Sequence, residues 1–127
     1  MSAKKKILVT DDERDLTLAY RDSLTRAGYD VTICNDGIEA LAAIKNIKPD
    51  LLLLDMIMPK KDGFAVLQEI RADHDFDDMP IFALSNLGQP GDEQKALELG
   101  ATEFIIKSDI SLKDLKIKIE QIINQQS

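Results

Sequence analysis

Short apolar runs alternate along the chain with longer segments in which apolar residues recur every three or four positions. Five runs have the character of strands: 6–10, 30–34, 51–55, 81–85 and 103–107. Three of them are almost wholly apolar, as is typical of strands that helices cover on both faces of a parallel sheet. Five segments have helical spacing: 14–27, 37–47, 63–71, 91–99 and 111–124. The pattern therefore predicts a βα-alternating domain.

Glycine and proline mark the ends of several predicted helices. Gly28 and Gly100 follow the first and fourth helical segments, where a residue in the left-handed conformation can close a helix. Pro49 prevents the second helix from continuing. The acidic segment 73–78 is predicted to be a solvated loop, and the last residues, 124–127, a frayed tail.

Length and charge narrow the class of protein. The chain has 127 residues, enough for one domain, whose core we expect over about residues 5–124. The net charge of −7 disfavours nucleic acid as a direct ligand, because phosphate contacts need clustered Lys and Arg. No apolar stretch approaches the roughly 18 residues of a membrane span, and the start lacks the apolar run of a signal peptide. The single cysteine, Cys34, is interpreted as a reduced core thiol of a cytoplasmic protein.

Polar residues follow the predicted strands where their carboxyl ends meet at one edge of the sheet. They are Asp11, Asp12 and Glu13 after the first strand, Asp55 at the end of the third, Ser85 at the end of the fourth and Lys107 at the end of the fifth. If the first and third strands are neighbours, their tips lie only about 5 Å apart. Carboxylates at so short a distance cannot all stay ionised unless a cation binds; otherwise the pKa of one of them rises. Oxygen ligands without imidazole or thiolate nearby favour Mg²⁺ as that cation.

The same set of residues suggests phosphoryl transfer. A carboxylate held beside Mg²⁺ can attack a phosphoryl donor, while the Ser85 hydroxyl and the Lys107 ammonium stabilise charge on the transferring oxygens. We therefore expect Asp55 to be the nucleophile.

With these residues the chain resembles the receiver domain of two-component response regulators, of the single-domain chemotaxis type, over about residues 5–123. The resemblance rests on the acid pair Asp11 and Asp12, the stretch "DMIMPKKDG" over 55–63, and Ser85, Phe104 and Lys107. It implies an α/β fold of the flavodoxin-like (βα)5 type, a three-layer sandwich with a parallel sheet in the order 2-1-3-4-5. The whole chain, 1–127, is expected to be one receiver domain.

The resemblance also implies a chemistry for the site. A sensor histidine kinase or a phosphotransfer protein would donate a phosphoryl group from phosphohistidine to Asp55. Asp12, Asp55 and the backbone carbonyl of Ile57 would hold Mg²⁺, and Asp11 would assist through water. The protein would be a phosphoprotein of a phosphorelay, with no substrate that it turns over.

A switch is implied as well. Ser85 would turn its hydroxyl toward the phosphoryl group, and the ring of Phe104 would move inward into the vacated space. The output would be a changed protein-binding face on the fourth helix, fifth strand and fifth helix. Its partner would be a downstream protein effector or, on phosphorylation, a second copy of the chain, with no nucleic acid or membrane bound directly.

Four positions depart from the family's usual pattern in three ways. Ser108 stands where proline usually follows the lysine, so the loop after Lys107 is expected to take its own path. Asn86 is larger and more polar than the small residue favoured after the switch hydroxyl, which suggests different access to the phosphoryl site. Ile57 and Leu87 are apolar where polar side chains can position a hydrolytic water, so we expect a slowly decaying phosphoaspartate.

Other interpretations stay open on the sequence alone. Asp11 and Asp12 could cap the first helix, and Phe104 could be an ordinary core residue. His74, in the acidic loop, is expected to carry neither phosphate nor metal. A degenerate receiver acting as a scaffold, or a small phosphohydrolase with an Asp nucleophile, are the alternative functions. One phosphohydrolase type has aspartate two residues after the nucleophile, where this chain has Ile57. The sequence does not identify the kinase, the target or the oligomeric state, nor whether the chain stands alone or was excised from a longer regulator.

Overall fold

The computed structural model describes residues 4–58, 61–86 and 89–125. Within these ranges the strands are β1 (Lys6–Thr10), β2 (Asp30–Cys34), β3 (Leu51–Asp55), β4 (Ile81–Ser85) and β5 (Glu103–Ile106). The α-helices are α1 (Arg14–Arg26), α2 (Gly37–Ile47), α3 (Gly63–Ala72), α4 (Asp92–Glu98) and α5 (Leu112–Asn124). Two short 3-10 helices, η1 (His74–Phe76) and η2 (Lys107–Asp109), complete the described elements. None of the described helices is long and apolar enough to cross a membrane.

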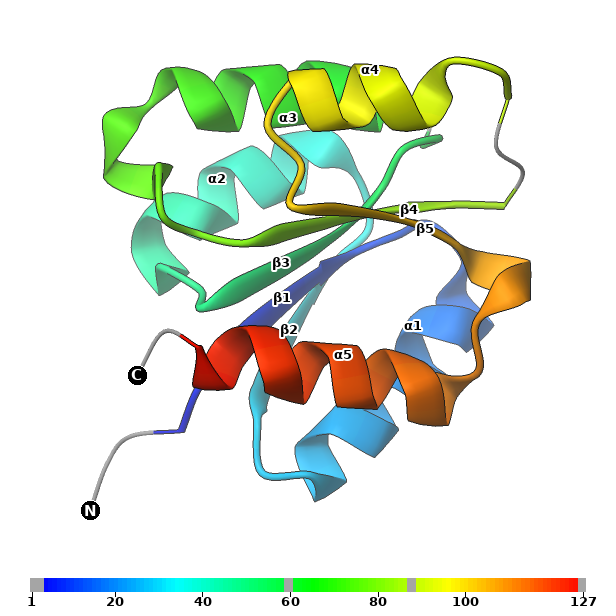
Figure 1. Cartoon of the computed structure of the whole chain (residues 1–127). Helices are drawn as coiled ribbons and strands as arrows, with labels where there is room; N and C mark the ends of the chain where they lie inside the picture. The colour runs from blue at the N-terminus through cyan, green and yellow to red at the C-terminus, as the bar shows by residue number, and fades with distance from the viewer. Residues whose placement is uncertain (1–3, 59–60, 87–88, 126–127) are drawn as a thin grey trace.

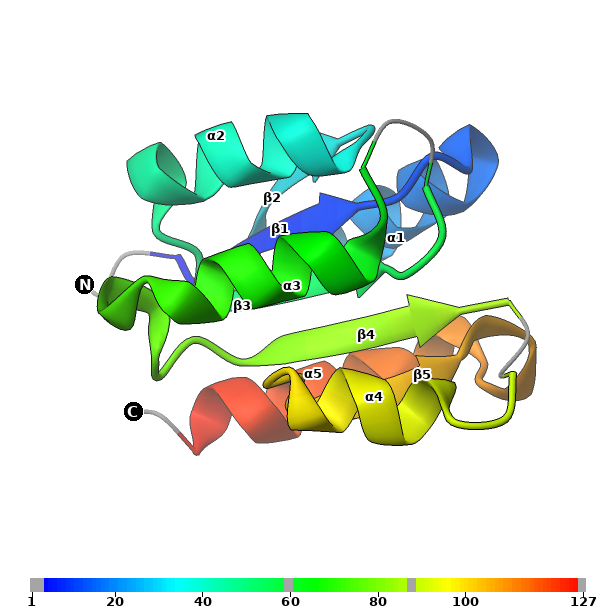
Figure 2. The same cartoon turned by 90° about the horizontal axis from the view of Figure 1, so that it is seen from above.

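The strands form one parallel sheet in the order β2-β1-β3-β4-β5. Helices α2, α3 and α4 cover one face of the sheet, and α1 and α5 cover the other (Figures 1 and 2). The expected three-layer flavodoxin-like sandwich and its strand order are therefore confirmed. Because β3 has β1 on one side and β4 on the other, its carboxyl end lies at the centre of one edge of the molecule.

The core is split by the sheet into two apolar layers. Side chains alternate between the faces of a strand, so Leu52 and Leu54 of β3 pack under α2 and α3, whereas Leu51 and Leu53 pack over α1 and α5. All four leucines are fully buried. Each contributes roughly 1.5–3 kcal/mol on burial, so this run anchors the strand that ends in Asp55.

Several helix ends have the predicted form. Gly28 and Gly100 follow α1 and α4 with φ angles of 100° and 110°, in the left-handed region that glycine tolerates. At the end of α2, Lys48 takes φ 51° and ψ 65° directly before Pro49. The right-handed helical region is disfavoured for a residue before proline, which explains why α2 ends there.

The acidic segment 73–78 differs from the predicted solvated loop. It contains η1, and Phe76 is only 7% exposed, packed in the core layer under α2 and α3. Arg71 of α3 donates through Nη1 to the carbonyl of Phe76 and through Nε to that of Gly100, 2.9 Å away. The aromatic ring and the arginine thus fix a segment whose acids suggested full solvation. His74 is exposed and faces Asp77 at 3.2 Å.

Candidate functional site

Three carboxylates meet at the carboxyl edge of the sheet. Asp55 is the last residue of β3, and Asp11 and Asp12 follow β1, the neighbouring strand. One oxygen from each lies within 4.8 Å of the others. Asp11 is fully buried and Asp55 is 3% exposed, whereas Asp12 is exposed to solvent. The pairing of β1 with β3 therefore brings these acids together as predicted.

Backbone hydrogen bonds fix the two buried carboxylates. Asp11 Oδ1 accepts from the backbone N–H of Glu13 at 2.9 Å, and Asp55 Oδ1 accepts from that of Ile57 at 3.1 Å. Each acid thus holds the turn after its own strand with one oxygen and leaves Oδ2 for the shared centre. Helix α1 has Glu13 as its N-cap, so neither Asp11 nor Asp12 occupies the capping position considered for them.

Lys107 brings a cation into this centre from the edge strand. The predicted fifth strand included Lys107, but β5 ends at Ile106 and Lys107 opens η2. Its side chain is only 5% exposed, with Nζ 2.6 Å from Asp11 Oδ2 and 3.5 Å from Asp55 Oδ2. Glu13 Oε2 lies 3.6 Å from the same Nζ. Burial alone would lower the pKa of Lys107, but these carboxylates outweigh it and raise the pKa above its ordinary value.

Three aspartates meet beside the single ammonium of Lys107, and the pKa of Asp55 reflects its burial and this excess of negative charge. Burial, followed by the charge of Asp11, raises the pKa of Asp55 to about 7, against the opposing effects of the Ile57 N–H and Lys107. A divalent ion would relieve this excess of negative charge. Three carboxylates with converging oxygens, without imidazole or thiolate among them, form a donor set that fits Mg²⁺.

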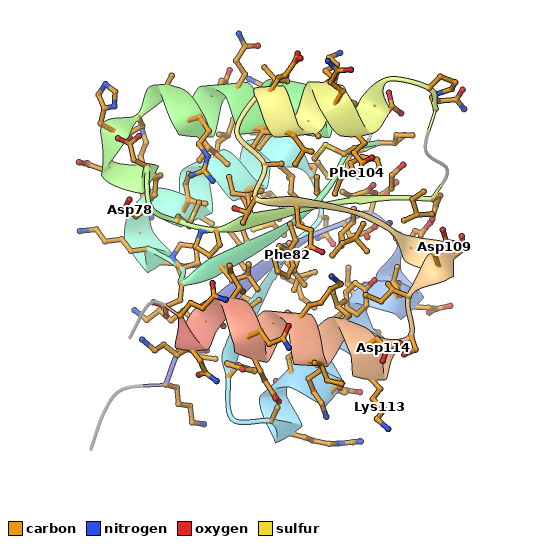
Figure 3. The ribbon with its side chains drawn as sticks, viewed as in Figure 1. Asp78, Phe82, Phe104, Asp109, Lys113 and Asp114 are labelled. Atoms are coloured by element: carbon orange, nitrogen blue, oxygen red, sulfur yellow. The ribbon has the colours of Figure 1, made fainter. Side chains whose placement is uncertain are left out.

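Ser85 and Phe104 lie on the strands beyond β3. Ser85 ends β4 and is 1% exposed, so its hydroxyl belongs to the same edge of the sheet as Asp55. Phe104 is half-buried in β5 beside Ala83 of β4, on the face that α4 covers (Figure 3). The structure therefore places a buried hydroxyl on β4 and a partly buried ring on β5, the two strands that α4 connects.

One contact beside the site was not predicted from the sequence. The side-chain amide of Asn86 donates through Nδ2 to Glu13 Oε1 at 2.9 Å. This hydrogen bond, helped by Lys107, lowers the pKa of Glu13 despite partial burial. The sequence placed Glu13 among the acids and singled out Asn86 as unusual, but it gave no signal that the two side chains pair.

Besides Asn86, three other positions depart from the family's pattern. Ile57 lies in the loop after β3 with its side chain 64% exposed. Ser108 lies within η2, and the described residues contain no cis peptide bond. Leu87 falls outside the described residues.

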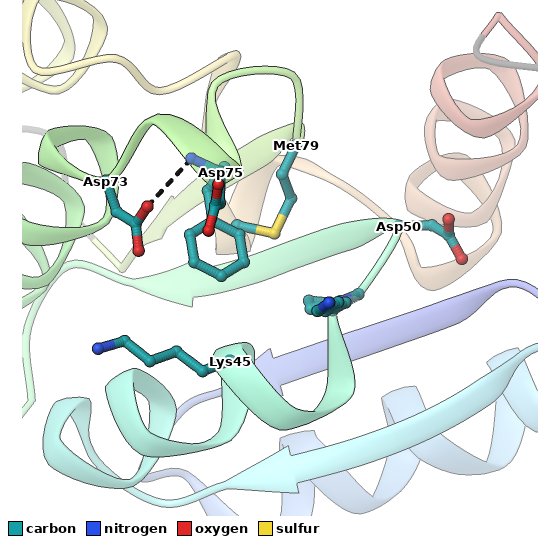
Figure 4. Close-up of a pocket in the computed structure, with 8 residues that line it drawn as sticks. Lys45, Asp50, Asp73, Asp75 and Met79 are labelled. Atoms are coloured by element: carbon teal, nitrogen blue, oxygen red, sulfur yellow. Dashed lines mark hydrogen bonds between the residues drawn. The ribbon is translucent and has the colours of Figure 1, made fainter.

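A hollow of about 740 Å³ lies away from the acidic site (Figure 4). Among its lining residues, Asp50 immediately precedes β3 and Met79 lies two residues before β4, so this hollow borders the amino ends of the strands. The carboxylates and Lys107 meet at the opposite edge. The hollow therefore takes no part in the acidic site.

Comparison with known proteins agrees with the geometry. The family described as the response regulator receiver domain matches residues 7–120. A probable transcriptional regulator, ycf27, of Guillardia theta is 38% identical over 98% of this chain and 48% of its own length. The alkaline phosphatase synthesis transcriptional regulatory protein PhoP of Bacillus subtilis is 36% identical over 95% of this chain and 49% of its own. The chain thus spans about half the length of these relatives.

Solved structures show the same fold. The receiver domain of the Francisella response regulator 1452 has a TM-score of 0.88 and 26% identity, covering 98% of this chain and all of that one. The chemotaxis protein CheY4 of Vibrio cholerae has a TM-score of 0.87 and 28% identity, covering 94% of this chain and 99% of that one.

Proposed function

The chain belongs to the response regulator receiver domain family, whose role is to accept a phosphoryl group, and we propose that Asp55 is the residue that accepts it. The observation that carries this proposal is the meeting of Asp11, Asp12 and Asp55 with the buried ammonium of Lys107. Asp55 is the central acid, at the end of the strand between β1 and β4. The donor is the phosphohistidine of a sensor histidine kinase or of a phosphotransfer protein.

In the reaction, an Asp55 carboxylate oxygen attacks the phosphorus atom of phosphohistidine. The P–N bond breaks, an acyl phosphate forms on Asp55, and the imidazole leaves with a proton from solvent. Lys107 moves from Asp11 and Asp55 to a phosphoryl oxygen, since its Nζ already lies 3.5 Å from Asp55 Oδ2. The Ser85 hydroxyl donates to another phosphoryl oxygen.

Asp12, Asp55 and the backbone carbonyl of Ile57 would hold Mg²⁺, with Asp11 contributing through a water molecule. When bound, the ion neutralises charge on the transferring oxygens as a Lewis acid. The exposure of Asp12 beside the buried Asp11 and Asp55 supports this division, because it leaves one side of the set open to solvent.

Phosphorylation adds about −1.5 to −2 charge beside the tips of β4 and β5. The Ser85 hydroxyl and the Phe104 ring respond, and the face formed by α4, β5 and α5 changes its affinity for a downstream protein effector or for a second phosphorylated copy. Hollows of about 490 Å³ and 570 Å³ border Phe104, one toward Pro90 and Gly91 and the other along α5. They support the proposal because they leave the ring room to repack.

We infer that residues 1–127 form one receiver unit of a cytoplasmic phosphorelay. The protein promotes its own phosphorylation and dephosphorylation and has no substrate that it turns over. Neither nucleic acid nor a membrane is bound directly by this unit.

Phosphotransfer from purified histidine kinases tests the acceptor. Wild-type protein should gain one phosphoryl group with Mg²⁺ present and none with a chelator, and Asp55→Asn should gain none. Asp22→Asn, an exposed acid on α1, is the matched control and should behave as wild type. Phosphate mapped to another residue would overturn the assignment of Asp55. Repeated turnover of a phosphate ester would favour the phosphohydrolase, and a protein that never takes phosphate or beryllofluoride would be a scaffold.

A further inference from the structure

The Glu13–Asn86 hydrogen bond crosses the end of the strand that carries the acceptor. Glu13 follows β1 and Asn86 follows β4, and β3 lies between those two strands. The bond of 2.9 Å therefore joins the two loops that flank Asp55. These residues are 73 positions apart, so the contact depends on the folded sheet and not on local sequence.

Two residues close to this bond are buried. The side chains of Asp55 and Lys107 are 4% and 5% exposed, whereas that of Glu13 is 44% exposed. Glu13 also contacts the buried ammonium of Lys107. The Nζ of Lys107 lies 3.6 Å from Glu13 Oε2 and 3.5 Å from Asp55 Oδ2. The bond thus lies at the exposed rim of the site, next to the buried ammonium of Lys107 that also contacts Asp55.

Building on the proposed function of Asp55, we propose that Glu13 and Asn86 form a gate that disfavours small-molecule phosphodonors relative to protein donors. A donor must approach Asp55 in line, and its phosphoryl oxygens need the ammonium that Glu13 shares. The Glu13 carboxylate repels a phosphoryl anion that arrives before the gate opens. A protein donor gains docking contacts around the site that help to open the gate, whereas a small donor has almost none.

The size of the effect follows from the bond that must break. Breaking a partly exposed hydrogen bond to a charged group should slow phosphorylation by a small donor about tenfold. A tenfold slower rate corresponds to a barrier higher by ~1.4 kcal/mol. Asn86→Ala removes the donor and keeps the Glu13 charge. Glu13→Gln keeps an oxygen that can accept from Asn86 but removes the charge. The two variants therefore separate closure by the hydrogen bond from repulsion by the carboxylate.

The test measures phosphorylation of Mg²⁺-loaded protein by phosphoramidate and, separately, by a histidine kinase. Asn86→Ala should react about tenfold faster with phosphoramidate. Its rate with the kinase should stay close to wild type. Glu13→Ala is measured alone and combined with Asn86→Ala. The double variant should gain less than the product of the gains of Glu13→Ala and Asn86→Ala, because both residues act through one contact. Asn46→Ala, an exposed asparagine on α2, is the matched control and should change neither rate.

A second readout does not depend on phosphorylation. Beryllofluoride should associate faster with Asn86→Ala than with wild type, while the Mg²⁺ affinity stays unchanged, because the variant keeps the three carboxylates that would hold the ion. Equal acceleration with both donors, or none with either, would overturn the gate while leaving Asp55 as the acceptor. Labelling of Asp55→Asn by phosphoramidate would instead overturn the acceptor assignment.

Discussion

Replacing Asp55 with asparagine is expected to stabilise the metal-free protein at neutral and alkaline pH. Burial and the charge of Asp11 raise the pKa of Asp55 from 3.8 to about 7. Between these values the folded protein keeps a proton on Asp55 that the unfolded chain has released. The free energy of unfolding of the wild type therefore falls as the pH rises through this window, and asparagine, which is neutral throughout, avoids that loss.

The pKa shift sets the magnitude. A rise of about three pKa units corresponds to about 4 kcal/mol, because each unit is worth about 1.4 kcal/mol. Roughly two of those units lie between pH 5 and pH 7. The difference in unfolding free energy between Asp55→Asn and wild type should therefore grow by about 3 kcal/mol from pH 5 to pH 8.

Urea unfolding of both proteins in the presence of a chelator, at steps of pH between 5 and 8, measures this difference. Asp22→Asn is the control, because its carboxylate is exposed and should leave the pH dependence unchanged. Adding Mg²⁺ at about one hundred times its dissociation constant should stabilise the wild type by about 2.7 kcal/mol and reduce the advantage of the variant. If the wild type and Asp55→Asn lost stability in parallel over this pH range, the argument from buried, crowded carboxylates would be refuted.

Three further outcomes are expected. Gly63→Ala should lower the free energy of unfolding by at least about 2 kcal/mol in urea, because an added Cβ would lie 2.4 Å from the backbone oxygen of the acceptor residue. Arg71→Met should cost about 2–3 kcal/mol, with Arg71→Lys as a comparison, since the carbonyls of Phe76 and Gly100 lose their donors. Cys34 should react with iodoacetamide far more slowly in the native protein than in urea, because the thiol is 4% exposed and burial raises its pKa to about 11; equal rates by mass spectrometry would contradict this.

Much of the fold could be predicted because its signals are local. Four of the strands occupy the predicted residues, since each apolar run is bounded by polar or turn residues. The convergence of Asp11, Asp12 and Asp55 followed from one topological rule, the shared carboxyl edge of parallel strands.

The features that were missed depend on contacts across the folded molecule. The fifth strand ends one residue before the prediction, where the Lys107 ammonium turns toward the buried acids. Phe76 is buried although charged neighbours surround it in the sequence. The Glu13–Asn86 bond joins two loops that no periodicity relates. In each case a side chain meets a distant partner, which local patterns of polarity do not encode.

Lys107 also braces the sheet. Its backbone follows the edge strand β5, yet its ammonium lies 2.6 Å from Asp11, which follows β1. Strands β3 and β4 lie between β1 and β5 in the sheet. One flexible side chain thus ties the rim of the sheet to its middle at a place where no backbone ladder connects them. An anion that binds the Lys107 ammonium would break its contact with Asp11. A charge placed at the centre of the sheet edge would therefore act directly on the end of β5, without a relay of intervening side chains.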